Sequence, residues 1–163
     1  MIFHLTQKLA KKIKLYPLEA LEAAHNPFID WTAHLFTVEH TQYIIVTNSS
    51  SLYSMVIYGR GITNNNEFTQ KTLNYMREYM TNDGCEFIYH RLIEPYTSQI
   101  SFGKATNRGV LGSMNEFIFH AKFFIGERRL SVFETSLEIN QTPMRYIGYK
   151  YSLEAFKELE AAN

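Results

Sequence analysis

The chain has 163 residues, enough for one domain with a substantial core, and its apolar share of 45% and charged share of 20% are ordinary for a globular protein. Sixteen basic residues balance sixteen acidic ones, which disfavours extensive nucleic-acid binding because proteins that contact many phosphates carry a basic excess. Cys85 is the only cysteine, so an internal disulfide and a cysteine-based zinc site are both excluded.

The first half of the chain alternates between strand and helix patterns. The expected elements are a strand at residues 1–5, a short helix after the N-cap Thr6, one or two helical turns at 18–24, a hairpin of 33–38 and 42–47, and a third strand at 52–58. Pro17 and the pair Asn26-Pro27 end the two early helical patterns, because proline and the residue before it disfavour helix.

The second half contains the two clearest amphipathic helices. The expected elements are a helix at 67–81, an ambiguous segment at 85–93 for which helix is favoured over strand, a strand within 96–105, a helix at 110–125, a short strand at 130–133, and a last helix capped by Ser152. These patterns predict a single α+β domain over residues 1–163, with an antiparallel or mixed sheet and about four to five packed helices.

The stretch Asn107–Phe117 places small and polar residues where a strand turns into the 110–125 helix. Backbone N–H groups at a helix start lack internal partners, so such a place can hold an anion. We therefore predict a polar site in which Arg108 binds the anion and Asn107 positions it. Ser113 or Asn115 would complete the site. In the alternative interpretation these residues are structural, and Arg108 pairs with an internal carboxylate.

A second group of candidates lies near the start of the hairpin. A carboxylate at Asp30 beside an imidazole at His34 can orient a general base. The alternative, which we favour, is that Trp31 packs over the sheet and His34 is hydrogen-bonded locally. His120 follows Asn115 on the 110–125 helix and could border the Arg108 site, although exposure on a helix face is the simpler explanation.

The stretch 107–116, Asn-Arg-Gly-Val-Leu-Gly-Ser-Met-Asn-Glu, resembles the hallmark Asn-Arg-Ser-Val-Leu-Gly-Ser-Met-Asn-Asp of a family of uncharacterised small bacterial proteins of unknown function. Further similarities lie at 6–12, 31–36, 47–48 with 52–54, and 140–144. Gly109 stands where that family has Ser, and Glu116 where it has Asp. The resemblance implies single-domain identity and no particular reaction.

Three functional hypotheses follow. We favour a non-catalytic binding protein that takes a small anion, a nucleotide phosphate or a partner's carboxylate near Val110. The second is a phosphoester hydrolase or nuclease that uses Arg108 with His34 or His120 as base. The third is a structural subunit of a homo-oligomer, built on the surplus of aromatic side chains.

The sequence favours neither a membrane nor a bound metal. The N-terminus does not resemble a signal peptide, and no run approaches the roughly 20 apolar residues of a membrane span. The six histidines form no HExxH pair and no tight cluster with acidic residues, so we expect no metal and no cofactor. We expect a cytoplasmic protein.

Overall fold

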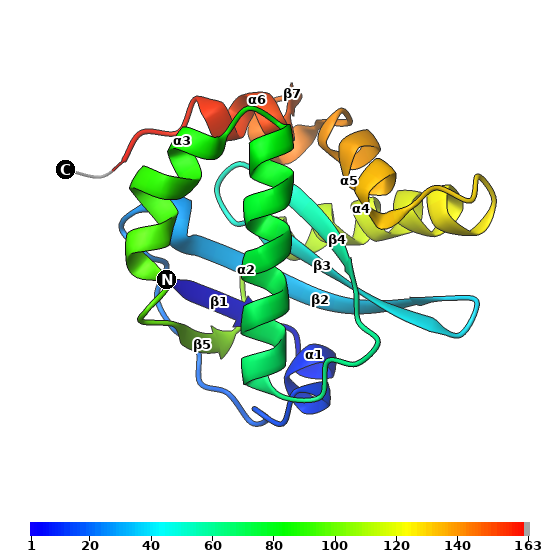
Figure 1. Ribbon diagram of the computed structural model, residues 1–163, viewed down its shortest axis with the longest axis horizontal. Coiled ribbons are helices and arrows are strands. Elements are labelled where there is room, and N and C mark those ends of the chain that lie inside the picture. Colours follow the sequence, from blue (N-terminus) through cyan, green and yellow to red (C-terminus); the bar gives the residue numbers. More distant parts are fainter. Residues whose placement is uncertain (162–163) are drawn as a thin grey trace.

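A five-stranded sheet with strand order β4-β3-β2-β1-β5 forms the middle of the molecule (Figure 1). The computed structural model describes residues 1–161. The strands are β1 (Ile2–Leu5), β2 (Asp30–Val38), β3 (Thr41–Asn48), β4 (Ser54–Tyr58) and β5 (Ser101–Lys104). Strand β1 is parallel to both of its neighbours, whereas β2, β3 and β4 form an antiparallel meander. The sheet is therefore mixed.

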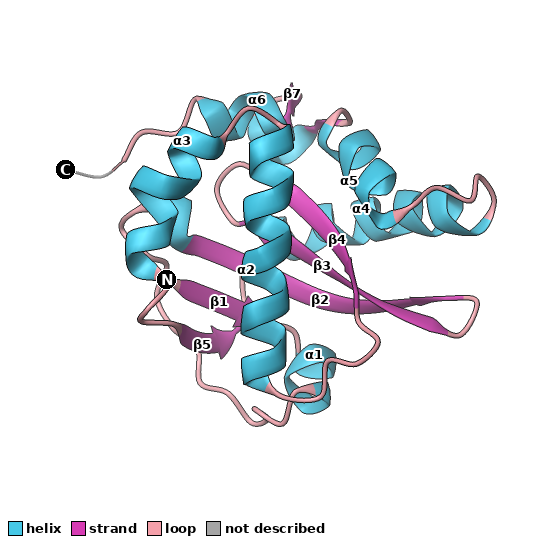
Figure 2. Cartoon of the chain, viewed as in Figure 1, coloured by secondary structure: helices cyan, strands magenta, loops and turns pink. Residues whose placement is uncertain are grey.

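Helices cover both faces of this sheet (Figure 2). They are α1 (Gln7–Lys12), α2 (Asn65–Asn82), α3 (Glu86–Ile88) continued by the π-helical η2 (Tyr89–Ile93), α4 (Arg108–Gly126), α5 (Val132–Asn140) and α6 (Ser152–Lys157). Three short 3₁₀ turns, η1 (Pro27–Ile29), η3 (Glu94–Tyr96) and η4 (Arg145–Ile147), and a two-stranded ladder of β6 (Pro143–Met144) and β7 (Lys150–Tyr151) complete the chain. The predicted α+β domain is confirmed. No helix within residues 1–161 is long and apolar enough to cross a membrane.

Because side chains along a strand point alternately to the two faces of the sheet, the core is divided into two clusters. On one face Trp31 and Val46 pack with α2 and with Phe156 of α6. On the other face Phe36 and Ile45 pack with α4 and α5. Successive side chains of a strand point to opposite faces, so β2, β3 and β4 each supply both clusters. The predicted helices at 67–81 and 110–125 are confirmed because their apolar stripes face these two cores.

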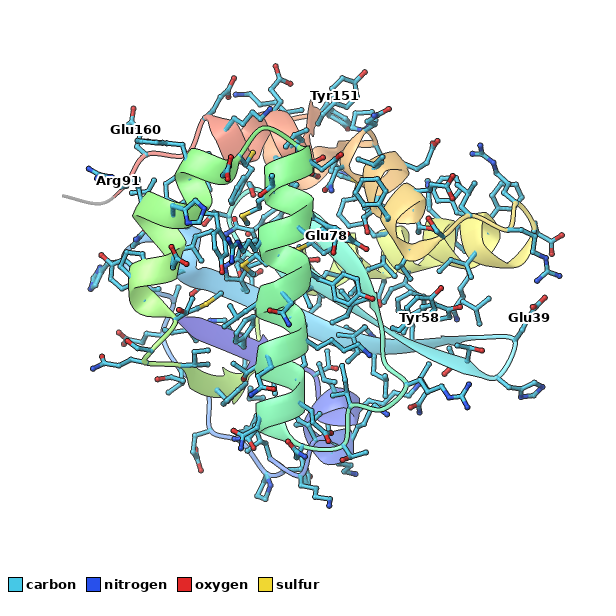
Figure 3. The ribbon with its side chains drawn as sticks, viewed as in Figure 1. Glu39, Tyr58, Glu78, Arg91, Tyr151 and Glu160 are labelled. Carbon is cyan, nitrogen blue, oxygen red and sulfur yellow. The ribbon has the colours of Figure 1, made fainter. Side chains whose placement is uncertain are left out.

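Helix α4 lies along β2 on the second face. The C-terminal residue of α4, Gly126, lies against Val38 at the end of β2, and the N-cap Asn107 shares a pocket with Asp30 at its start. A helix of 19 residues is about 28 Å long and a strand of nine residues about 30 Å, so the two elements match in length. The two ends of α4 therefore meet opposite ends of β2. Figure 3 shows Glu39 at the projecting tip of the β2–β3 hairpin, where Arg129 pairs with it at 2.8 Å.

Residues 14–26 form an irregular segment, here called the strap, that crosses the edge strand β5. The amide of Lys104 donates to the carbonyl of Glu19 at 2.8 Å. A Cβ on Gly103 would lie 2.8 Å from Cγ of Leu21, so only glycine lets the strap come this close. The prediction of helical turns at 18–24 is wrong, because these long-range contacts outweigh the local helix propensity of the segment.

Two further predictions are corrected by the structure. The expected strand at 130–133 is instead the start of α5, whose N-cap Ser131 forms a capping box with Glu134. Ser152 does not cap the last helix: it is the first residue of α6, and its buried hydroxyl has no hydrogen-bond partner among the described residues. Both corrections concern helix starts, where propensity alone is a weak guide.

Candidate functional site

A polar pocket of about 230 Å³ opens between the sheet, the strap and the start of α4. We call it the strap pocket. Its lining residues come from β1, the strap, β2, the turn after β3 and the approach to α4: His4, Leu21, Ala23, Asp30, Thr32, Ser49, Thr106 and Asn107. The pocket lies on the same face as the α4–α5 core but on the β1–β2 side. There the sheet presents polar rather than apolar side chains.

A buried histidine–aspartate pair forms the wall of the strap pocket. His4 is 8% exposed and Asp30 is 2% exposed, and Nε2 of His4 lies 3.1 Å from Oδ2 of Asp30. The same oxygen accepts a hydrogen bond from the amide of Ala24 at 2.7 Å. The parallel register pairs Ile2 with Asp30 and His4 with Thr32, which brings both side chains to one face of adjacent strands.

Asp30 is the fixed negative charge of the pocket. Burial raises the pKa of its carboxyl, but hydrogen bonds from His4, Ser49 and Ala24 more than offset this, so the pKa lies below its ordinary value. An ionised carboxylate can only accept hydrogen bonds, so the proton between the pair sits on Nε2 of His4. In the neutral imidazole Nδ1 of His4 would be the acceptor, and within residues 1–161 no hydrogen bond to that atom is found.

The start of α4 is largely satisfied by its own N-cap. Oδ1 of Asn107 accepts hydrogen bonds from the amides of Gly109 at 3.0 Å and Val110 at 3.1 Å. Those two amides are therefore not free to bind an anion. The ring of Tyr146 covers Gly109 so closely that a Cβ there would lie 2.4 Å from it. A ring thus occupies the space that any side chain at position 109 would need.

The other residues predicted around Arg108 do not converge on one ligand position. Arg108 is exposed, does not line the strap pocket, and has no carboxylate within 4.0 Å among residues 1–161. Ser113 is buried and donates to the carbonyl of Gly109 at 3.0 Å. Asn115 is exposed on α4. The alternative interpretation, in which Arg108 pairs with an internal carboxylate, is thus not seen in this part of the chain.

The hairpin candidates separate onto two faces. Trp31 is fully buried in the α2-side core, and its indole N–H donates to the carbonyl of Phe28 at 2.9 Å. Asp30 and His34 share a face but lie four residues apart on β2, which places them about 13 Å apart. Nδ1 of His34 is hydrogen-bonded to the hydroxyl of Thr6 at 3.0 Å instead. Burial, with further contributions from nearby Lys8 and Lys122, lowers the pKa of His34.

His120 lies on α4 among aromatic rings, 6.0 Å from Phe119 and 6.2 Å from Phe124 between ring centroids. Twelve residues of helix separate it from Arg108, which corresponds to about 18 Å along the axis. The two side chains therefore do not share a site. Across residues 1–161 no three His, Cys, Asp or Glu side chains gather closely enough to hold a metal ion.

Sequence reasoning missed His4. Nothing in the short strand Ile2–Leu5 marks it, because its partner Asp30 is 26 residues away and is reached only through the parallel pairing of β1 with β2. The one available signal was alternation: His4 is a polar residue between the apolar residues Phe3 and Leu5. Such a residue faces away from the core that its neighbours enter.

The structure is an α+β domain with a small polar pocket at the β1–β2 side of its sheet. The sequence model of a domain of unknown function, DUF6933, matches residues 2–155. The chain belongs to this family, so the resemblance to an uncharacterised family is confirmed. No curated protein and no solved structure matches the chain.

Proposed function

We propose that the protein is a binding protein and that the strap pocket is its ligand site. The observation that carries this proposal is the convergence of buried polar side chains from separate segments on one opening, with His4 and Asp30 at its wall. Buried polar groups that are not needed for a strand ladder or a helix cap are costly, so their gathering around a pocket favours a ligand.

The chemistry of the wall favours a ligand that donates hydrogen bonds. Asp30 is ionised at neutral pH, and a second negative charge placed against it would be repelled. The hydroxyls of Thr32 and Ser49, which lie 3.0 Å from each other, can donate or accept. Leu21 and Ala23 of the strap add an apolar side. A sugar or the base of a nucleoside combines these properties.

The volume of the strap pocket limits the size of the ligand. Drug-sized sites span roughly 300–1,000 Å³, and this pocket holds about 230 Å³. A monosaccharide or a nucleobase fits that limit better than a whole nucleotide does. The anion predicted from the sequence belongs outside the pocket, on the Arg108 side of Asn107. Binding of an anion at Arg108 is therefore the competing outcome in the experiment below.

Thermal-shift measurements with a defined panel test the proposal. The panel contains D-ribose, D-glucose, adenosine and guanosine, with inorganic phosphate as the anionic arm. A ligand at a hundred times its dissociation constant stabilises the native state by about 2.7 kcal/mol. For a domain of this size that raises Tm by roughly 5–11 °C. Calorimetric titration then measures the affinity of each ligand that stabilises the protein.

Matched variants locate the binding. Thr106 is an exposed residue that lines the pocket, whereas Thr37 is exposed at the far end of β2. Thr106→Val should weaken binding and Thr37→Val should leave it unchanged. Stabilisation by phosphate that is lost in Arg108→Gln would favour the anion site instead. A panel in which no sugar or nucleoside binds in a Thr106-dependent way would refute the proposal.

The His4–Asp30 pair favours one second candidate, a hydrolase. A histidine that donates from Nε2 to a carboxylate is held in the tautomer whose Nδ1 accepts a proton, which is the arrangement of a general base. This geometry favours His4 over His34 or His120 as the base of such an enzyme. His4→Gln should abolish hydrolysis of a nucleoside panel, and circular dichroism of the variant checks that it is folded. Unchanged hydrolysis in that variant would exclude it.

A further inference from the structure

The outer face of α4 carries two phenylalanines that the fold leaves in solvent. Phe119 is 75% exposed and Phe123 is 52% exposed, although α4 packs its opposite face into the core. Along the same outer face lie Gly112 and Glu116, both exposed. These four residues follow one another at intervals of four, three and four, which is the spacing of a helix seam that packs against a second helix.

The residues of this seam are arranged symmetrically about the middle of α4. The midpoint between Gly112 and Phe123 lies between residues 117 and 118, and so does the midpoint between Glu116 and Phe119. In an antiparallel pair of identical helices related by a two-fold axis at that point, each member of such a pair faces the other member on the second copy. The seam can therefore pack against itself.

The shapes across this two-fold axis are complementary. A Cβ built on Gly112 meets no atom within 4 Å, so Gly112 is an open gap in the surface of the helix. Under the symmetry, the exposed ring of Phe123 from one copy covers Gly112 of the other. Glu116 faces Phe119 of the second copy, where its carboxylate can meet the electropositive edge of the ring.

The charges at the two ends of α4 are complementary as well. Arg108 and Glu127 share the same midpoint, so each would face the other on the second copy. Both are exposed, and neither has an ion-pair partner among residues 1–161. The neighbouring cations are already used: Arg128 lies 3.8 Å from Glu138, and Arg129 pairs with Glu39.

We propose that α4 is the interface of a two-fold symmetric dimer of this chain, with Phe119 and Phe123 at its centre and an Arg108–Glu127 ion pair at each end. A helix about 28 Å long and about 10 Å wide covers roughly 280 Å². Stable interfaces bury about 800 Å² on each partner. The dimer is therefore weak and forms with rising concentration. This proposal does not depend on a ligand in the strap pocket.

Sedimentation equilibrium over a concentration series tests the dimer. The mass should rise from 19.1 kDa towards twice that value as the concentration increases. Phe119→Ser and Phe123→Ser should each lower the association constant at least tenfold. The control is Phe87→Ser on α3, because Phe87 is 72% exposed beside Arg91, on the part of the molecule away from α4 (Figures 1 and 3).

Charge reversal tests the register. Arg108→Glu and Glu127→Arg should each weaken the dimer, because each variant brings two like charges together at both ends. The double variant should restore association, since it recreates both ion pairs in reverse. All these positions are exposed, and circular dichroism of each variant checks that it is folded. A wild-type protein that stays monomeric at every concentration overturns the proposal. A double variant no better than the single ones overturns the register.

Discussion

Replacing Asp30 by asparagine should destabilise the protein in a pH-dependent way. Oδ2 of Asp30 accepts from His4 at 3.1 Å and from Ala24 at 2.7 Å, and the residue is 2% exposed. Hydrogen bonds to a charged group contribute about 1.5–3 kcal/mol each and neutral ones about 1 kcal/mol. Asparagine can keep both bonds when its Oδ1 takes the place of Oδ2, but only as neutral, weaker bonds. We therefore expect a loss of about 2 kcal/mol.

The pH dependence follows from the lowered pKa of Asp30. A carboxyl whose folded-state pKa is depressed stabilises the native state fully above its unfolded pKa of about 3.9, and loses this contribution as the pH falls through the folded-state pKa. The difference between wild type and Asp30→Asn should thus be constant from about pH 5 to 8 and shrink below about pH 4.

Urea denaturation at pH 7.0, 5.0 and 3.5 measures this difference, and thermal unfolding gives a second estimate. About 2 kcal/mol corresponds to a fall in Tm of roughly 4–8 °C for a domain of this size. Glu22→Gln, an exposed change on the same strap, is the control and should alter stability by less than about 0.5 kcal/mol. Equal stability of Asp30→Asn and wild type at pH 7, or a difference at pH 3.5 that is no smaller than at pH 7, would refute the reasoning.

Three further predictions concern other parts of the fold. Cys85 is 1% exposed, and burial raises the pKa of its thiol to about 11. The native protein should therefore react with a thiol reagent at pH 8 only as fast as the fold opens around Cys85. Rapid stoichiometric labelling would contradict this. The pKa of His34 is lowered in the folded state. Between that pKa and the ordinary value of about 6.5, the unfolded state therefore binds more protons than the folded state. The free energy of unfolding of the wild type should rise with pH in this range relative to that of His34→Gln, and parallel stability curves would exclude the effect. Gly103→Ala should cost about 1–3 kcal/mol in urea denaturation by pushing Leu21 and the strap away, unlike the open-surface change Gly112→Ala.

Strong periodicity made the long elements predictable from the sequence. The helices α2 and α4 and the β2–β3 hairpin follow from apolar spacing that the two cores then use. Helix α5 was missed because Leu130–Phe133 looks like a strand. The capping box of Ser131 and Glu134 was present in the sequence and would have indicated a helix start.

The strap and the site depended on contacts that no local pattern contains. Residues 18–24 have good helix formers, but the chain is held extended by bonds to Lys104 and Asp30. The sequence marked Asp30 and Asn107 as candidates, and both line the strap pocket. It did not connect them, because their proximity comes from α4 lying along β2 rather than from spacing.

The most direct test of the strap pocket is the movement of backbone amide signals in a ¹H–¹⁵N NMR titration with adenosine and, separately, D-ribose. If these ligands bind as proposed, the amide signals of Ala23, Thr32, Ser49 and Thr106 should shift to saturation with a single dissociation constant. Thr106→Val should raise that dissociation constant. Shifts that cluster elsewhere, or none at millimolar ligand, would contradict a ligand site between the strap and the start of α4.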